Sequence, residues 1–416
     1  MPSTCRHRAS FEGTGTVGAL FRDHAEEYIT IYQPCLRTIK LMRSIRVCRT
    51  PALGGQQLIC KGCGKVRYQY FSCGNSHCPI CGGIKRMHWQ DKLRNRMLNV
   101  PYSHITFTLP HDLNGLAKRN QWVVYNLLFH SAWKTIKRLC SKPKNVGGLP
   151  GMSAVLHTWG SDLKYHVHVH CLVTFGGYNN KEGAWYWPRR KNKIAPYRKL
   201  SGKFKSIFLE GLKKSMDKGD IAYHLSYDEL ENLLPKKRWV VNHQWPTAEP
   251  KVIEQYLGRY ICRIGISNKR LSYDKDGSNV RIEYNDYRKQ ESGKAAPKAY
   301  RDLPPLVAIA QIVQHQLPSS FQRSRHYGLH AACTYKRLED VLPNTVKCNG
   351  ATVRTVLQLL KALLKQEPYQ CEVCQGTDFE TTMLVPDKTY IRQYLPLTGR
   401  NPPIITKRAP KEKAFT

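Results

Sequence analysis

The chain has few acidic residues and no long apolar run. Its 416 residues include 30 Asp and Glu against 66 Lys and Arg, which gives a net charge of +36. No stretch reaches the roughly 18 consecutive apolar residues that suggest a membrane span, and residues 1–15 lack the apolar core of a secretion signal. A G-x-x-x-x-G-K-S/T loop is also absent, so we expect no nucleotide cofactor. So large a positive surplus predicts a polyanionic partner, with nucleic acid as the first candidate and an anionic membrane surface as the second.

The cysteines are concentrated near the N-terminus. Six of the 15 lie between Cys48 and Cys81, and four of these form the pairs CKGC (Cys60, Cys63) and CPIC (Cys78, Cys81), with 14 residues between the pairs. Without a secretion signal we expect a cytosolic protein, in which thiols stay reduced and clustered cysteines bind metal. Two C-x-x-C turns at this separation predict one tetrahedral Zn²⁺ site, because each turn presents two thiolates. The alternative is that they are ordinary reduced cysteines of a core.

Other cysteines and histidines of the same region have no assigned partner. A second zinc site is a further hypothesis, with the ligands Cys48, Cys73, His77 and His24. A third pair, CEVC at residues 371–374, lies near the C-terminus and is either half of a metal site or an incidental turn. The N-terminal domain is therefore expected to hold one or two zinc ions.

Hydrophobic periodicity indicates both helices and strands. One or two helices are expected between residues 21 and 46, a basic helix after Cys81, and a polar loop or small hairpin at 176–205. Further helices are predicted at 122–139, 204–218 and 252–263, and strands at 102–110, 153–160, 165–175 and 239–245. This order favours an α+β domain with an antiparallel sheet. The segment from Pro402 onward is expected to be disordered.

The segment YHVHVHCLV (residues 165–173) carries three histidines at period two. Alternate side chains of a strand share a face, so the imidazoles of His166, His168 and His170 would project from one side. The valines and the cysteine between them would fill the other side. Such a row of imidazoles suits a metal ion or a phosphate group, or it is only polar filler on an exposed strand.

Two tyrosines lie on a predicted helix. In VIEQYLGRYICR, Tyr256 and Tyr260 are four residues apart, which places both hydroxyls on one face, and Arg259 and Arg263 flank them. Such a pair commonly serves packing or lies on a wet surface. Tyrosine is also a nucleophile when it is activated. A divalent ion held by imidazoles would polarise a phosphodiester and stabilise charge on the leaving oxygen, so the histidines and tyrosines fit one reaction centre.

Several motifs of the chain resemble a known family. They extend from about residue 24 to about residue 329 and include CRTPALGG, SCGNSHCPIC, VPYSHITFTLP, VLHTWG, HVHVHCLV, YLGRYICRIGISNKRL and RSRHYGLHA. Together they resemble the insertion-sequence-91 family of two-tyrosine HUH transposases, part of the rolling-circle endonuclease group. The resemblance implies an N-terminal zinc-binding domain and an HUH endonuclease domain whose central antiparallel sheet is flanked by helices. We expect these units at residues 1–98 and 99–330, followed by a C-terminal region at 331–416 with a C-x-x-C pair and a basic disordered tail.

In this family HUH denotes histidine, a bulky hydrophobe and histidine. The resemblance assigns Mg²⁺ or Mn²⁺ to His168 and His170, because further apolar residues follow them, with His166 as a third ligand or a neighbour. Single-tyrosine relatives carry a polar ligand four positions after the nucleophile, whereas here those positions are a tyrosine and an isoleucine. His157 on the neighbouring strand is a further candidate, and a hydrogen-bonded sheet histidine is its alternative role.

The resemblance also implies a mechanism. One tyrosine attacks a phosphodiester of single-stranded DNA at an element end and leaves a 5′-phosphotyrosine and a free 3′-OH. The second tyrosine permits another strand transfer before the first end is released, and no ATP is required. The expected partner is single-stranded DNA of element ends and target, without a membrane, for a monomer or homodimer in the prokaryotic cytosol, associated with the nucleoid. Phosphate contacts are expected from Arg259, Arg263, Lys269 and Arg270, a solvated basic turn being the alternative for the last two.

Two other functions stay open at this point. HVHVHCL also satisfies the signature of histidine-triad hydrolases, in which a histidine attacks the α-phosphate of a nucleotide. Those proteins are small and need neither zinc, nor a tyrosine pair, nor a large positive charge. The second alternative is a non-catalytic, zinc-containing DNA-binding protein, which would bind DNA in a salt-sensitive manner without cutting it.

Overall fold

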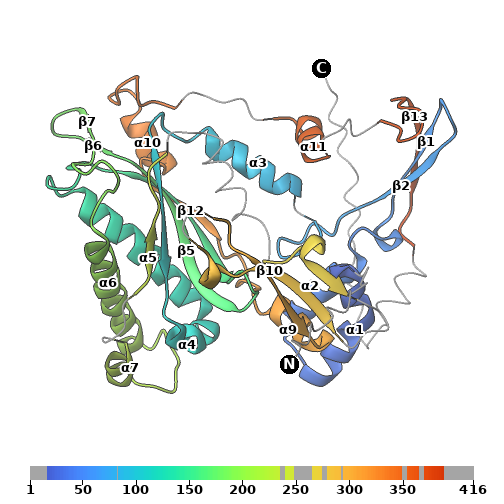
Figure 1. Cartoon of the computed structure of the whole chain (residues 1–416), viewed down its shortest axis with the longest axis horizontal. Coiled ribbons are helices and arrows are strands. Elements are labelled where there is room, and N and C mark those ends of the chain that lie inside the picture. Colours follow the sequence, from blue (N-terminus) through green and yellow to red (C-terminus); the bar gives the residue numbers. More distant parts are fainter. Residues whose placement is uncertain are drawn as a thin grey trace, which may run out of the picture.

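A five-stranded antiparallel sheet lies at the centre of the structure, a computed structural model that describes residues 16–81, 83–234, 239–247, 265–273, 279–291, 294–348, 354–364 and 370–387 (Figure 1). The strand order is β12-β4-β5-β3-β8. These strands are β3 (Tyr102–Thr108), β4 (Gly151–Trp159), β5 (Tyr165–Thr174), β8 (Val241–His243) and β12 (Ser324–Gly328). The fold is α+β with a central antiparallel sheet, as the sequence predicted.

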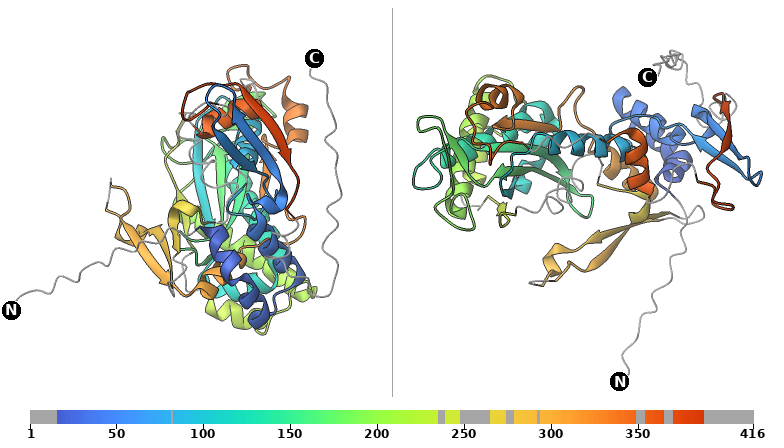
Figure 2. Two further views of the ribbon diagram at one scale, coloured as in Figure 1. Left: turned by 90° about the vertical axis from the view of Figure 1, so that its right-hand side faces the viewer. Right: turned by 90° about the horizontal axis from the view of Figure 1, so that it is seen from above.

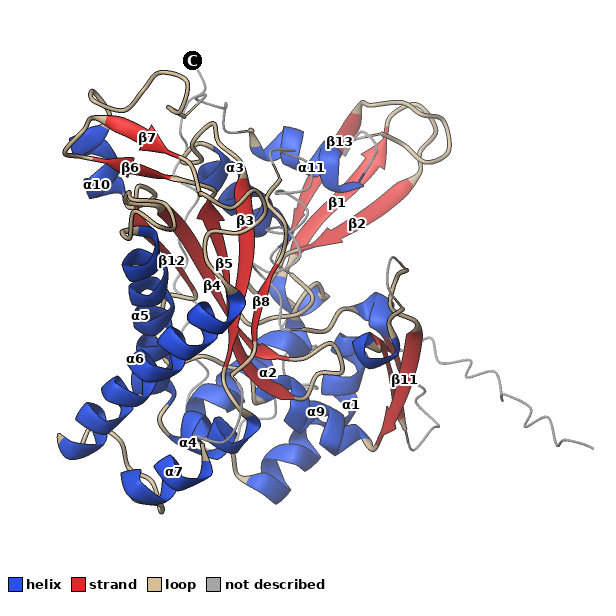
Figure 3. Cartoon of the chain, turned by 60° about the vertical axis from the view of Figure 1, so that its left-hand side comes forward, coloured by secondary structure: helices blue, strands red, loops and turns tan. Residues whose placement is uncertain are grey.

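One face of the sheet is apolar and packs against two long helices (Figure 3). α5 (Gln121–Cys140) and α6 (Tyr197–Asp217) contact each other along this side of the sheet. The core between sheet and helices contains fully buried side chains, among them Phe107, Phe129, Leu156, Val167, Val169, Cys171 and Phe204. The prediction that the apolar residues of β5 share one face is therefore confirmed.

The opposite face of the sheet is polar near its middle. There it carries the histidines of β3, β4 and β5, whose side chains alternate with the apolar set. At one end of this face a smaller apolar cluster forms under α3 (Gly83–Arg94) and α10 (Ala332–Leu338). Its members include Leu93, Val155, Leu172, Leu329 and Leu338. The histidines thus lie beside this cluster and outside the main core.

A second apolar cluster joins the N-terminal helices to a distant segment of the chain. α1 (Val17–Tyr32) packs against α2 (Leu36–Val47) and α9 (Pro305–Val313). α1 begins where Thr16 Oγ1 accepts a hydrogen bond from the Ala19 amide, a normal N-cap. The small sheet β11-β10-β9 adds to this cluster and projects from the body (Figure 2). Its strands are β9 (Leu271–Tyr273), β10 (Val280–Asn285) and β11 (Lys298–Leu303).

A third sheet is built from both ends of the described chain. β1 (Gly55–Cys60) pairs with β2 (Val66–Tyr70) on one side and with β13 (Phe379–Leu384) on the other. β13 is antiparallel to β1 over six residue pairs, from Gly55↔Leu384 to Cys60↔Phe379. The domain boundaries at residues 98 and 330 stay a prediction; this sheet crosses both of them, and the second apolar cluster crosses the first.

Most predicted elements are present. The two N-terminal helices, α5 and the strands of the central sheet are confirmed, while α6 begins earlier than residue 204 and β8 is shorter than predicted. The region 176–205 contains the hairpin β6 (Gly177–Asn179) and β7 (Ala184–Tyr186) and the start of α6. The remaining elements are α4 (Asn114–Arg119), α7 (Tyr227–Leu233), α11 (Val356–Leu364), η1 (Pro51–Leu53), η2 (His111–Leu113), η3 (Asn268–Arg270) and η4 (Tyr287–Lys289).

Two predicted segments, the helix at 252–263 and the tail from Pro402, lie outside the described residues. Among the helices of the described ranges, none is long and apolar enough to cross a membrane.

The packing of the central sheet can be tested at Leu156. This side chain is fully buried on the apolar face of β4, so Leu156→Ala is expected to destabilise the sheet by about 2–5 kcal/mol. Leu36→Ala is the matched control, because Leu36 is 70% exposed on α2, and it should change stability by at most about 0.5 kcal/mol. Thermal melting, with hydrogen exchange of β4 and β5, measures both variants. Equal effects of the two substitutions would contradict this packing.

Candidate functional site

Three histidines converge on the polar face of the central sheet. His168 and His170 are alternate residues of β5, and His157 lies directly opposite His168 on β4. One ligand atom from each of the three lies within 4.8 Å of the others. The Nε2 atoms of His168 and His170 are 3.0 Å apart. The sheet register therefore brings three imidazoles to one point.

The hydrogen bonds on the outer nitrogens, with Gln244 placed so that its Oε1 faces His104, select one tautomer for each of the two β5 histidines. His168 Nδ1 donates to the carbonyl oxygen of His166 at 2.9 Å, since that oxygen only accepts. His104 Nδ1 donates to Gln244 Oε1 at 3.1 Å. His104 Nε2 therefore accepts, and the donor is His170 Nδ1 at 2.9 Å. Both Nε2 atoms thus carry a lone pair, and the two lone pairs face each other.

Facing lone pairs repel unless a cation lies between them. An octahedral cation with bonds of about 2.1 Å holds neighbouring ligand atoms about 3.0 Å apart, which agrees with the 3.0 Å between the two Nε2 atoms. Ligand histidines usually donate their other ring N–H to an outer partner, as both do here. The residues present therefore fit a divalent metal ion.

The pKa values of these histidines favour the neutral ring. Burial lowers the pKa of His168 to about 3, and the neighbouring His166 adds to the effect. Burial also lowers the pKa of His104 to about 4. Burial, followed by the nearby rings of His157 and His168, lowers the pKa of His170 well below its ordinary value. All three are neutral at pH 7, the form in which imidazole binds metal.

The third histidine of this cluster is His157, whereas the sequence first suggested His166. His166 was expected as third ligand or neighbour, but the described group consists of His157, His168 and His170. The His166 ring instead lies beside His111, with centroids 5.3 Å apart. His157 is buried and stacks on Trp159 at a centroid distance of 4.5 Å. The cross-strand residue thus takes the place expected of His166.

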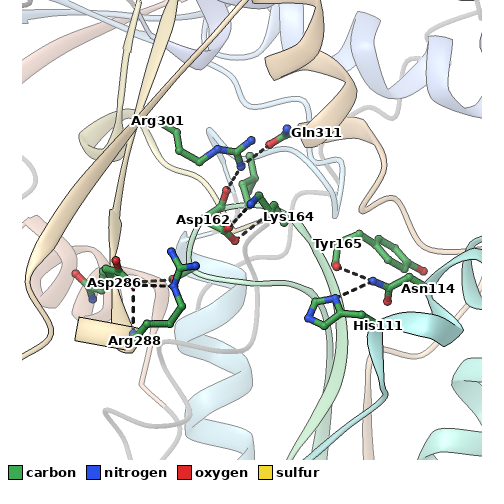
Figure 4. Close-up of polar contacts among 12 residues, drawn as sticks. His111, Asn114, Asp162, Lys164, Tyr165, Asp286, Arg288, Arg301 and Gln311 are labelled. Atoms are coloured by element: carbon green, nitrogen blue, oxygen red, sulfur yellow. Dashed lines mark hydrogen bonds and ion pairs between the residues drawn. The ribbon is translucent and has the colours of Figure 1, made fainter. Parts of the chain in front are cut away.

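The turn between β4 and β5 is held from outside the sheet (Figure 4). Arg301 of β11 donates from Nη1 to the Asp162 carbonyl oxygen at 2.8 Å and to Gln311 Oε1 at 3.2 Å. On the other side, Asn114 Nδ2 donates to the Tyr165 carbonyl oxygen at 3.2 Å. The small sheet therefore fixes the turn at Asp162, and α4 fixes the first residue of the histidine strand.

Leu163 in the same turn has a left-handed backbone. Its φ of 65° is uncommon for a branched side chain, and its side chain is fully buried. The Leu163 carbonyl oxygen accepts from His315 Nε2 at 3.1 Å, so His315 Nδ1 accepts from Thr158 Oγ1 at 3.2 Å. A buried, neutral histidine thus supports the turn that begins β5.

Arg270 has an internal role in the structure. Its guanidinium donates to the backbone carbonyls of Gly265 and Ser161, and from Nε to that of Glu283 at 2.9 Å. We expected Arg270 to contact DNA. In the structure its guanidinium is used within the protein, where it anchors the β4–β5 turn. Lys269 is exposed next to it, and its DNA contact stays a prediction.

One cysteine cluster lies between α2 and α3. Cys48 at the end of α2 meets Cys73, Cys78 and Cys81 of the loop before α3, with all four sulfurs within 4.8 Å of one another. Cys73 Sγ and Cys81 Sγ are 3.7 Å apart, close to the edge of about 3.8 Å that a zinc tetrahedron with 2.3 Å bonds requires. Four reduced thiols in this arrangement fit a structural Zn²⁺ ion.

The CKGC and CPIC pairs belong to different clusters. CKGC meets CEVC of the C-terminal region, in a group formed by Cys60, Cys63, Cys371 and Cys374. The predicted single site was therefore wrong in its grouping of Cys60, Cys63, Cys78 and Cys81. The spacing of a C-x-x-C turn identifies a pair of ligands, but it does not identify the pair that faces it.

The histidines of the hypothetical second zinc site lie elsewhere. His24 Nε2 contacts Tyr273 Oη at 2.7 Å, and His77 Nε2 accepts from the Leu317 amide at 3.1 Å. Of that set, only Cys48 and Cys73 enter a described cluster. Tyr256, Tyr260, Arg259 and Arg263 lie outside the described residues.

Comparison with known families agrees with this combination of a cysteine-rich head and a histidine-bearing sheet. The family model described as "Transposase zinc-binding domain" matches residues 20–109. The model described as "Putative transposase" matches residues 151–337, which include β4, β5 and β12. The class of protein is therefore a transposase with an N-terminal zinc-binding domain.

Two curated relatives narrow the assignment. The chain is 34% identical over 323 residues to the "Putative transposase y4qJ" of Sinorhizobium fredii (strain NBRC 101917 / NGR234), covering 75% of this chain and 79% of the relative. It is 27% identical over 357 residues to the "Transposase for insertion sequence element IS801" of Pseudomonas savastanoi pv. phaseolicola, covering 81% of each. No solved structure matches significantly. The chain belongs to the insertion-sequence-91 family of transposases, and the partner of its positive charge is DNA.

The buried state of His315 predicts a pH dependence. Burial lowers its pKa from 6.5 to about 4, so the folded chain takes up this proton later than the unfolded chain as the pH falls. Stability is therefore lost between pH 6.5 and about 4, on the order of 3 kcal/mol for this residue. His315→Gln should reduce the slope of unfolding free energy against pH in that window, measured by urea denaturation. His224→Gln, at an exposed position, is the control, and the prediction fails if both variants keep the wild-type slope.

Proposed function

We propose that the chain cuts and rejoins single-stranded DNA at the ends of its element, with tyrosine nucleophiles and 5′-phosphotyrosine intermediates, as in rolling-circle transposition. The nucleophiles are Tyr256 and Tyr260, and a Mg²⁺ or Mn²⁺ ion binds to His157, His168 and His170. The observation that carries the proposal is the convergence of His157, His168 and His170 on one point of the sheet, with the Nε2 atoms of His168 and His170 3.0 Å apart. In a transposase, a metal site on the central sheet is best explained as the reaction centre.

The chain around the tyrosine segment supports its place in this reaction. Before it, Thr247 exchanges two backbone hydrogen bonds with Tyr102 at the start of β3. After it, Gly265 lies so close to the Trp159 ring that an added Cβ would be 2.3 Å from Cδ1, and Trp159 stacks on His157. Gly265 lies five positions after Tyr260, a chain length of at most about 18 Å. This length is compatible with the position of Tyr260 that the proposal requires.

The proposed reaction proceeds by direct displacement at phosphorus. The tyrosine oxygen forms a bond to phosphorus and loses its proton to solvent, while the bond from phosphorus to the 3′ oxygen breaks and that oxygen takes a proton from solvent to become the free 3′-OH. The metal ion, when bound, polarises the phosphate and stabilises charge on the leaving oxygen. The role of the protein is to orient the ligands: Gln244 fixes His104, which fixes His170. The second tyrosine allows a further strand transfer while the first end stays attached.

Exposed aromatic side chains support a single-stranded substrate. Trp187 after β7 is 54% exposed and Trp245 after β8 is 77% exposed. Aromatic rings stack on unpaired bases without regard to sequence, and nearby lysines and arginines bind the phosphates. We further propose that Cys48, Cys73, Cys78 and Cys81 bind a structural Zn²⁺ ion in the DNA-binding head.

A covalent-capture assay tests the nucleophiles. The protein is incubated with Mn²⁺ and single-stranded DNA of an element end that is labelled at its 3′ end, because the fragment downstream of the cut stays on the tyrosine. A labelled protein band on a denaturing gel is expected for the wild type and is lost in the Tyr256→Phe/Tyr260→Phe double variant. The single variants rank the two tyrosines. Tyr300→Phe, at a residue that is 54% exposed on β11, is the control.

The other outcomes of this assay identify the alternatives. Absence of an adduct, with DNA binding intact, would contradict catalysis and favour the non-catalytic DNA-binding protein. An adduct that survives the double tyrosine substitution would contradict the proposed nucleophiles. If that adduct is also acid-labile, a phosphohistidine is formed, as the histidine-triad alternative predicts.

His157→Ala tests the third metal ligand. Loss of even an outer-shell partner of a metal ligand costs about 10–100-fold in affinity or activity, so removal of His157 should reduce both Mn²⁺ affinity and single-turnover cleavage by at least that factor. Mn²⁺ binding is followed by electron paramagnetic resonance, independently of cleavage. His130→Ala, at an exposed histidine of α5, is the matched control. Unchanged Mn²⁺ affinity in His157→Ala would exclude His157 as a ligand.

A further inference from the structure

We propose that Cys60, Cys63, Cys371 and Cys374 bind a second structural zinc ion, which fastens the C-terminal segment to the N-terminal hairpin. The zinc-binding family model ends at residue 109, so it assigns no role to the CEVC pair. The inference goes beyond the proposed function and does not depend on the tyrosine chemistry. We call this cluster the terminal clip.

The distances in the terminal clip fit a zinc tetrahedron and exclude disulfides. Cys60 Sγ lies 3.4 Å from Cys374 Sγ, and Cys63 Sγ lies 3.6 Å from Cys371 Sγ. A disulfide requires about 2.05 Å. The edge of a tetrahedron with Zn–S bonds of 2.3 Å is about 3.8 Å. All four sulfurs lie within 4.8 Å of one another.

The two C-x-x-C turns of the terminal clip have the same backbone hydrogen bonds. The Gly64 amide donates to the Cys60 carbonyl oxygen at 2.8 Å, and the Gln375 amide donates to that of Cys371 at 3.0 Å. The residue after the second cysteine is left-handed in both turns, with φ of 71° at Gly64 and 60° at Gln375.

In each turn the backbone amide of the first cysteine donates a second hydrogen bond. The Cys60 amide donates to the Lys65 carbonyl oxygen at 2.9 Å, and the Cys371 amide donates to that of Gly376 at 2.8 Å. Two turns far apart in the sequence thus present their sulfurs in the same way, from opposite sides. An incidental C-x-x-C turn gives no reason for this match, whereas a shared tetrahedral ion does.

Two glycines lie next to a sulfur of the terminal clip. An added Cβ at Gly62 would be 3.4 Å from Cys374 Sγ, and one at Gly376 would be 3.3 Å from the same sulfur. Each turn therefore has a glycine next to the shared centre, where a larger residue would press on a ligand. This arrangement leaves the sulfurs free to adjust to the ion.

The strand that follows the CEVC turn, β13, buries little side-chain surface. In β13 the four residues from Glu380 to Met383 are exposed, and Phe379 and Leu384 are only partly buried. The Lys61–Asp378 ion pair, at 3.2 Å, joins two exposed side chains and contributes little. A strand without an apolar core is marginal in water. Metal binding would add to the hydrogen-bond ladder with β1 and to the cation–π contact of Arg67 with Phe379 in holding β13, because its free energy adds directly to folding.

Zinc content per chain tests the terminal clip. The full-length protein is purified with Zn²⁺, and its metal is quantified by mass spectrometry. Cys371→Ser/Cys374→Ser is expected to lose about one equivalent of zinc. Cys48→Ser/Cys73→Ser is expected to lose the zinc of the other cysteine cluster and to keep that of the terminal clip. Cys35→Ser/Cys333→Ser removes exposed thiols outside the clusters and should lose none. Hydrogen exchange should show loss of protection in residues 379–384 of the first variant, with β5 unchanged. Full zinc retention in Cys371→Ser/Cys374→Ser would overturn the proposal.

Thiol alkylation gives a second test on the unmodified chain, so misfolding of a variant cannot obscure the result. Cys63 and Cys374 are exposed, as are Cys35 and Cys333. A hydrogen bond with Thr38 lowers the pKa of Cys35, so each thiol is compared with itself before and after a chelator removes the metal. As zinc ligands, Cys63 and Cys374 should react with iodoacetamide at least about tenfold faster after chelation, whereas Cys35 and Cys333 should not change. Peptide mapping measures each site. Equal reactivity of Cys374 before and after chelation would refute the terminal clip.

Discussion

The alternation of β5 between two environments is the constraint on which the rest of the structure depends. Val167, Val169 and Cys171 are fully buried against α5 and α6, so the register of this strand cannot slip by one residue without exposing all of them. The same alternation sends His168 and His170 to the polar face. The free energy that fixes the core therefore also fixes the imidazoles, although the histidines themselves contribute little to packing.

The neighbours of β5 complete the site, one from each side. β4 supplies His157 directly opposite His168, and β3 supplies His104, which hydrogen-bonds His170. Gln244, just after β8, orients His104 in turn. The strand order β4-β5-β3-β8 thus places the third histidine of the cluster on one side of β5 and the hydrogen-bonded pair His104 and Gln244 on the other. A helix carrying the same histidines would lack these two flanking partners.

Local periodicity allowed the central strands, α5 and the shared face of the β5 histidines to be predicted from the sequence. The third histidine of the cluster and the cysteine grouping could not be predicted from local spacing, because both depend on pairing between distant segments. His166 and His170 are four residues apart on one strand, about 13 Å, so three alternate histidines cannot all converge on one ion. A residue on the next strand can. Likewise, the CEVC and CKGC turns lie next to each other only because β13 pairs with β1.

The C-terminal region links the central sheet to the cysteine-rich head. α10 contacts β12 at the sheet, and α11 contacts α3. In the chain between these two helices, Arg354 donates from Nη2 to Asp91 Oδ1 at 2.7 Å. Asp91 is only 2% exposed. Burial opposes the ionised form of Asp91, but hydrogen bonds from Arg354 outweigh it and lower its pKa. Beyond α11, β13 pairs with β1. One segment therefore contacts the central sheet, α3 and the cysteine-rich head in turn, and so couples their positions.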